Sequence, residues 1–77
     1  MSNAELKKKL RFELLKPKRK LREERLKNEL TTSYVASLIG LERRQYEKKE
    51  AGEFPFHDYE MKILADKFGK TVTELFY

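Results

Sequence analysis

Apolar residues recur at helical spacing in the middle of the chain, within residues 32–39. Those that share one face of a helix there are Val35, Ala36 and Ile39. Gly40 follows, and glycine commonly ends a helix because it adopts the left-handed backbone conformation without steric cost. Segment 43–50 is polar at nearly every position and has Tyr46 as its one large apolar residue. We therefore predict two short helices joined by a tight turn, the second of them anchored by Tyr46.

Further helical patterns lie on both sides of this pair. Pro17 suits the first turn of a helix over residues 18–28. Residues 58–68 carry an apolar stripe at helical spacing, formed by Met61, Leu64, Ala65 and Phe68. Thr71 and Glu74 have the spacing of a capping box, which predicts a last short helix after them.

Residues 5–16 form a basic, amphipathic pattern whose leucines are Leu6, Leu10 and Leu14. Three interpretations are open: a helix packed on the body or on a second subunit, a basic helix on a membrane surface, or a disordered or artificial tail. We favour the first. The membrane interpretation is the least favoured, because the segment is short and nothing else in the chain suggests lipid. Residues 1–4 are set aside, because Ser2-Asn3-Ala4 resembles the remnant of a purification tag.

The composition limits the chemistry that the chain can perform. Its 77 residues suit one small domain, and they include no cysteine and a single histidine, His57. These residues leave little for a nucleophile–base pair or a metal centre, so we predict no enzyme, no catalytic residue, no metal and no cofactor or small-molecule substrate. The absence of a membrane-length apolar run or a signal peptide predicts a soluble, cytoplasmic protein without membrane contact.

Charge is distributed unevenly along the sequence. Residues 1–27 contain eleven Lys and Arg against four Glu, a balance of +7. Residues 28–77 contain seven Lys and Arg against nine Asp and Glu, a balance of −2. A basic arm on a nearly neutral body suits a polyanionic partner, but basic solvated surfaces are common and charge alone does not decide.

The register of residues 30–52 resembles the Cro/repressor-type helix-turn-helix family of phage and bacterial transcription regulators, the XRE family. The matching motifs are Leu30-Thr31, Val35-Ala36-x-x-Ile39-Gly40-Leu41 and Glu50-Ala51-Gly52. The likeness covers about residues 20–76 and implies an all-α, five-helix, lambda-repressor-like DNA-binding domain over residues 17–77. Residues 1–16 are then an N-terminal extension. The family usually has glycine where this chain has Glu29, so we expect Asn28 to take the left-handed position that ends its helix.

The resemblance also implies which residues meet duplex DNA. The helix over residues 43–50 would lie in the major groove, where Arg reads guanine through its two acceptors. The base-reading residues implied by the register are Arg43, Arg44, Glu47 and Lys48. Those implied at the DNA backbone are Thr32, Ser33, Gln45, Lys49 and Ala51. Arg25 and Glu50 resemble a structural pair that ties the first helix of the domain to the recognition helix.

The resulting interpretation is a sequence-specific DNA-binding transcriptional regulator of phage or mobile-element type. The alternative is a protein-interaction module, such as an antitoxin that neutralises a partner protein, although the chain lacks a long acidic tail to wrap a toxin. We expect a homodimer, because one recognition helix contacts too few base pairs to select an operator. Phe76 and Tyr77 are the apolar residues expected at the dimer interface, with the N-terminal helix as an addition.

Overall fold

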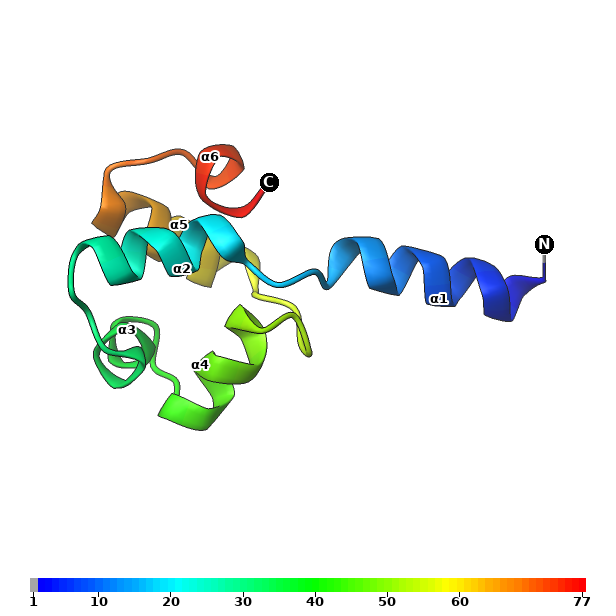
Figure 1. Ribbon diagram of the computed structural model, residues 1–77, viewed down its shortest axis with the longest axis horizontal. Coiled ribbons are helices and arrows are strands. Elements are labelled where there is room, and N and C mark those ends of the chain that lie inside the picture. The colour runs from blue at the N-terminus through cyan, green and yellow to red at the C-terminus, as the bar shows by residue number, and fades with distance from the viewer. Residues whose placement is uncertain (1) are drawn as a thin grey trace.

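The computed structural model describes residues 2–77, including all side chains except those of residues 12–14. Six helices and no strand are found in this described part of the chain (Figure 1). The helices are α1 (Asn3–Leu14), α2 (Arg19–Lys27), α3 (Thr32–Leu38), α4 (Arg43–Glu50), α5 (Asp58–Phe68) and α6 (Val72–Phe76). The prediction of an all-α chain is confirmed, as is the presence of five helices in residues 17–77.

Helices α2 to α6 close around one hydrophobic core (Figure 1). Three buried aromatic rings line up through it, with ring centroids 6.1 Å apart for Tyr46 and Phe56 and 5.2 Å apart for Phe56 and Phe76. Both contacts are edge to face, which is a favoured geometry for aromatic pairs. The other buried apolar residues are Leu21, Val35, Ala36, Ile39, Leu64, Ala65 and Leu75. The apolar stripes predicted from spacing in α3 and α5 therefore supply much of the core.

Capping residues set the ends of the helices. Gly40 has a φ of 70°, which lets the backbone N–H of Leu41 reach the carbonyl oxygen of Ala36 at 2.9 Å and ends α3. Helix α4 begins and ends where the sequence predicts it. At the start of α6, the Glu74 N–H donates to Thr71 Oγ1 at 3.1 Å, and the Thr71 N–H donates to Glu74 Oε1 at 3.0 Å. The predicted capping box is therefore present.

The end of α2 differs from the prediction. Glu29, with a φ of 56°, takes the left-handed conformation, whereas Asn28 has a φ of −90°. The N–H of Leu30 then bonds the carbonyl oxygen of Arg25 at 3.0 Å, and the N–H of Glu29 bonds that of Leu26 at 3.0 Å. This hydrogen-bond pattern requires the left-handed residue one position after Asn28, whatever side chain that residue carries.

One of the two C-terminal aromatics, Phe76, also differs from the prediction. Phe76 is part of the core, and Tyr77 is 72% exposed. Helix α6 packs on both α2 and α5, so Phe76 lies against the ring of Phe56. The expectation that Phe76 would be left over for a dimer interface is therefore wrong, because α6 turns it inward.

Helix α1 projects from the body formed by the other five helices (Figure 1). Its start is capped, because Ser2 Oγ accepts from the N–H of Glu5 at 3.2 Å. Leu6 and Leu10 are each 46% exposed, so the predicted helix is present but does not pack on the body. Among the described residues, no helix has both the length and the apolar character needed to cross a membrane.

Candidate nucleic-acid interface

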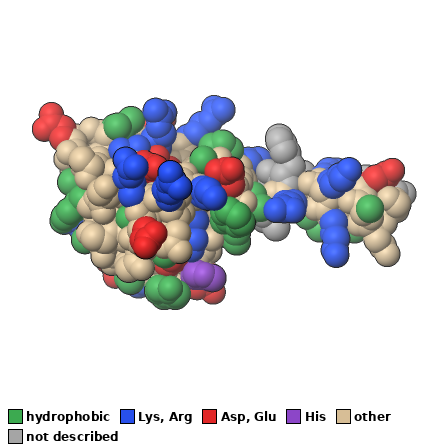
Figure 2. Space-filling model, turned by 90° about the horizontal axis from the view of Figure 1, so that it is seen from below, with side chains coloured by type: hydrophobic (Ala, Val, Ile, Leu, Met, Phe, Trp, Pro, Cys, Tyr) green, Lys and Arg blue, Asp and Glu red, His purple; other side chains and the backbone are tan. Residues whose placement is uncertain are grey.

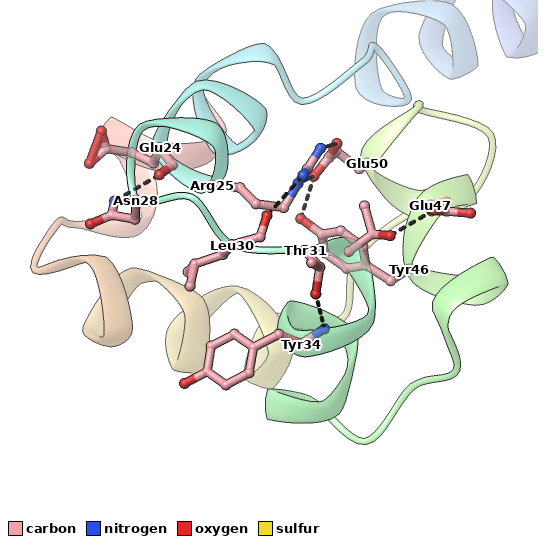
Figure 3. Close-up of polar contacts among 10 residues, drawn as sticks. Glu24, Arg25, Asn28, Leu30, Thr31, Tyr34, Tyr46, Glu47 and Glu50 are labelled. Atoms are coloured by element: carbon pink, nitrogen blue, oxygen red, sulfur yellow. Dashed lines mark hydrogen bonds and ion pairs between the residues drawn. The ribbon is translucent and has the colours of Figure 1, made fainter.

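Helix α4 is fixed to the body by a buried ion pair (Figure 3). Arg25 of α2 donates from Nε to Glu50 Oε2 at 2.9 Å and from Nη2 to Glu50 Oε1 at 3.0 Å. Its third nitrogen, Nη1, donates to the carbonyl oxygen of Leu30 at 3.1 Å. Arg25 and Glu50 are thus paired as the resemblance implies, in a bidentate geometry that fixes both side chains. The hydrogen bonds with Glu50 raise the pKa of Arg25, which keeps its charge in place.

Tyr46 completes this buried cluster one turn before Glu50. Its ring is fully buried, and its hydroxyl donates to Glu50 Oε2 (Figure 3). Burial raises the pKa of Tyr46 well above its ordinary value, and the hydrogen bond with Glu50 raises it further. The predicted anchor therefore has two parts, an apolar ring in the core and a hydroxyl bound to the ion pair.

Lys49 also turns toward the body. Its Nζ donates to Glu60 Oε1 at 2.6 Å, and only 11% of its side chain is exposed. Glu60 is fully buried at the start of α5, where Oε1 also accepts from the N–H of His57 at 2.8 Å. The ammonium group that the resemblance implies at the DNA backbone is thus placed in an interior ion pair that links α4 to α5.

The opposite face of α4 is open to solvent. Arg43, Arg44, Glu47 and Lys48 are all exposed. On a helix these four positions lie within one arc. Arg44 and Lys48 lie on the side away from Tyr46 and Glu50, whereas Arg43 and Glu47 lie at the edge between the two faces. Seen from below, the molecule shows Lys and Arg side chains gathered on the body and along the projecting helix (Figure 2). The structure therefore brings the four candidate base-reading residues together on one accessible surface.

The candidate backbone-contacting residues have different surroundings. Thr32 Oγ1 donates to Glu47 Oε2 at 2.7 Å, which ties the start of α3 to the exposed face of α4. Gln45 is exposed, and its Oε1 accepts from the N–H of Glu42 at 2.9 Å. Ser33 and Ala51 are exposed as well. Thr32 thus positions a candidate base-reading carboxylate, a role that the motif alone does not indicate.

Two further residues shape this region, and reasoning from the sequence did not predict their roles. Gly52 follows α4 with a φ of 86°, and a Cβ added there would lie 2.0 Å from the carbonyl oxygen of Leu15. Glu60 is buried under α4 and pairs with Lys49. Its spacing of three residues after His57 is that of a capping pair and was the available signal. No comparable signal in the sequence indicates that the backbone of residues 15–17 packs against Gly52.

Within the part of the chain that the structure describes, no group of three or more His, Asp or Glu side chains could hold a metal ion. Comparison with protein-family models, with curated proteins and with solved structures finds no match for this chain. The resemblance to Cro/repressor-type regulators therefore rests on the motif residues in the sequence, and it stays a prediction.

Proposed function

We propose that the protein binds duplex DNA in a sequence-specific manner as a transcriptional regulator, with a lambda-repressor-like domain formed by α2 to α6. The observation that carries the proposal is the division of α4 into two faces. Tyr46 and Glu50 fix one face to the body, Arg44 and Lys48 are exposed on the other, and Arg43 is exposed at the edge between them. A short helix so held can enter the major groove without losing its fold.

In this proposal the exposed residues of α4 read base edges. Arg43 and Arg44, in the first turn, are suited to guanine, because a guanidinium group donates to both O6 and N7. Glu47 is suited to the amino group of cytosine, and its hydrogen bond with Thr32 holds the carboxylate in one orientation. Lys48 adds positive charge at the C-terminal part of the same surface. Ser33 and Gln45 are exposed beside it and can donate to phosphate oxygens.

The regulator would act as a homodimer on two related half-sites. Each good bidentate contact supplies about 1–3 kcal/mol of discrimination, so one α4 helix is too little to select an operator in a genome. Two copies separated by about one DNA turn double the number of base contacts. The origin in a phage or mobile element follows from the family resemblance alone.

Selection of bound duplexes from a random pool tests this proposal directly. We expect an enriched, two-fold-related sequence. Arg44→Ala should then weaken binding to that sequence by about ten- to a hundred-fold, because the variant cannot form the bidentate hydrogen bonds to guanine. Lys62→Ala is the matched control, since Lys62 is an exposed cation on α5 whose ion pair with Asp66 is also exposed. A pool without enrichment would reject DNA reading and would favour the protein-interaction module.

A further inference from the structure

The place where α1 leaves the body is fixed next to the recognition helix. The N–H of Lys18 donates to the carbonyl oxygen of Glu50, the last residue of α4, at 2.8 Å. Just before it, the backbone of residues 15–17 lies over Gly52, so closely that any Cβ at position 52 would collide with it. The connection between α1 and α2 therefore packs on the C-terminal end of α4. The C-terminal end of α1 is held at this point, and the helix projects away from it.

A hollow of about 640 Å³ lies between α1 and the end of α4. Four cationic residues line it, three from the extension and one from the exposed face of α4: Lys8, Arg11, Lys16 and Lys48. Glu53 is the one acidic residue among the described residues that line it. Leu15 and Phe54 contribute apolar surface, and the Lys48 ammonium lies 5.8 Å from the centre of the Phe54 ring. We call this feature the cationic hollow.

Ion pairs do not neutralise the charges of the cationic hollow within the part of the chain whose side chains the structure describes. Among the described side chains, none of its four cations forms an ion pair with a carboxylate. The pKa of nearby Lys18 is lowered by burial and also by the positive charge of Lys16. A concave surface that gathers like charges raises the local concentration of anions, and an anion placed there would relieve their repulsion.

We propose that the cationic hollow receives the phosphodiester backbone of the duplex that α4 reads, so that α1 is a second DNA-contacting element. This inference rests on the proposed function. Lys48 belongs both to the exposed face of α4 and to the hollow, so a polyanion lying along that face continues into it. The apolar surface from Leu15 and Phe54 suits deoxyribose, the sugar that alternates with phosphate along the DNA backbone. The proposal also explains an amphipathic helix that contributes no buried residue to the core among its described side chains.

The test compares two double variants of α1 from which the same charge is removed. Lys8→Gln with Arg11→Gln removes two cations of the hollow, whereas Lys7→Gln with Lys9→Gln removes two that do not line it. Affinity for the selected duplex is measured at several salt concentrations for the full chain and for both variants. Removing one cation–phosphate interaction lowers the slope of log affinity against log salt by roughly 0.9. We expect this slope to fall by about 1–2 in the first variant and to stay unchanged in the second.

The contrary outcomes are distinct. Equal slopes for the two variants, whether both lowered or both unchanged, would overturn the inference while leaving DNA binding by the wild type intact. A wild-type chain that binds no duplex would overturn the proposed function, and this inference with it. Binding of the wild type to vesicles containing phosphatidylserine, abolished by Lys8→Gln with Arg11→Gln while the DNA salt slope is kept, would assign the hollow to lipid instead. Unchanged melting temperatures, measured by circular dichroism, verify that both variants fold.

Discussion

Helix α4 carries two groups of charged residues whose surroundings are opposite. Lys49 and Glu50 point into the body, where each has a partner from another helix. Arg44 and Lys48 point into solvent on the other side of the same eight-residue helix, and Arg43 is exposed at the edge between the two sides. Along the sequence these residues look alike, because charges fill nearly the whole helix. The difference teaches that helical phase, set by Tyr46, decides which charges stabilise the fold and which are available to a partner.

The two groups should differ in energy as well as in place. Breaking a buried ion pair by removing one partner costs about 3–5 kcal/mol, because the other charge is left without compensation. An exposed charge contributes about 0–1 kcal/mol to folding. Substitutions on the inner face should therefore change stability, and those on the outer face should change binding.

The largest effect is expected for Tyr46→Ala. Loss of a buried aromatic side chain costs about 3–5 kcal/mol, which is much of the stability of a small domain. This variant also removes the hydroxyl that binds Glu50. Urea unfolding should show a domain that is largely unfolded or much less stable, whereas Lys48→Ala on the outer face should stay within about 0.5 kcal/mol of the wild type. Equal midpoints for these two variants would contradict the division into two faces.

A somewhat smaller loss is expected for Arg25→Ala, about 3 kcal/mol. The substitution leaves the Glu50 carboxylate buried with only the Tyr46 hydroxyl, and it leaves the carbonyl oxygen of Leu30 without its guanidinium donor. Glu23→Ala, on the exposed side of α2, is the control and should cost less than about 0.5 kcal/mol. Thermal unfolding of the two variants provides the measurement. Similar melting temperatures would show that the Arg25–Glu50 pair makes no net contribution to the free energy of unfolding.

Local patterns in the sequence were sufficient for most helix positions. The range of α4 and the burial of Tyr46 followed from one apolar residue in a polar segment with a glycine before it. The buried pair of Arg25 and Glu50 followed only from the family resemblance, because periodicity does not say which distant charges meet.

Features that depend on distant contacts could not be predicted in this way. Lys49 is a cation in a basic segment, so the sequence indicates a contact with DNA. Only the packing of α5 places Glu60 beside its ammonium group. Phe76 lies at the end of the chain and gives no sign that α6 turns back onto the core. The backbone from Leu15 to Pro17 passes directly over Gly52, although these residues lie about 36 positions earlier in the sequence.

Alkaline pH should weaken the inner face selectively. An unfolded tyrosine has a pKa near 10, and burial raises the pKa of Tyr46 in the folded state. The contribution of Tyr46 is therefore fully present below about pH 10 and is lost as the pH rises above it, at up to about 1.4 kcal/mol per pH unit. Tyr46→Phe removes this titration. In urea unfolding between pH 8 and pH 11, the advantage of the wild type over Tyr46→Phe should shrink above pH 10, and a constant difference would show that the hydroxyl does not titrate on unfolding.

The smallest effect concerns the turn that positions Leu30 for Arg25. Glu29 holds a φ of 56° there, and a left-handed conformation costs an L-residue roughly 1–2 kcal/mol, which glycine avoids. Glycine also loses more backbone entropy on folding, so Glu29→Gly should stabilise the domain by about 0.5–1 kcal/mol net. Glu23→Gly is the matched control, because the same change inside α2 should destabilise by about 1 kcal/mol. Opposite shifts in the urea midpoint, with DNA affinity unchanged in the Glu29→Gly variant, would confirm that this turn serves the inner face alone. Destabilisation by both glycines would mean that the Glu29 side chain contributes more than its backbone strain costs.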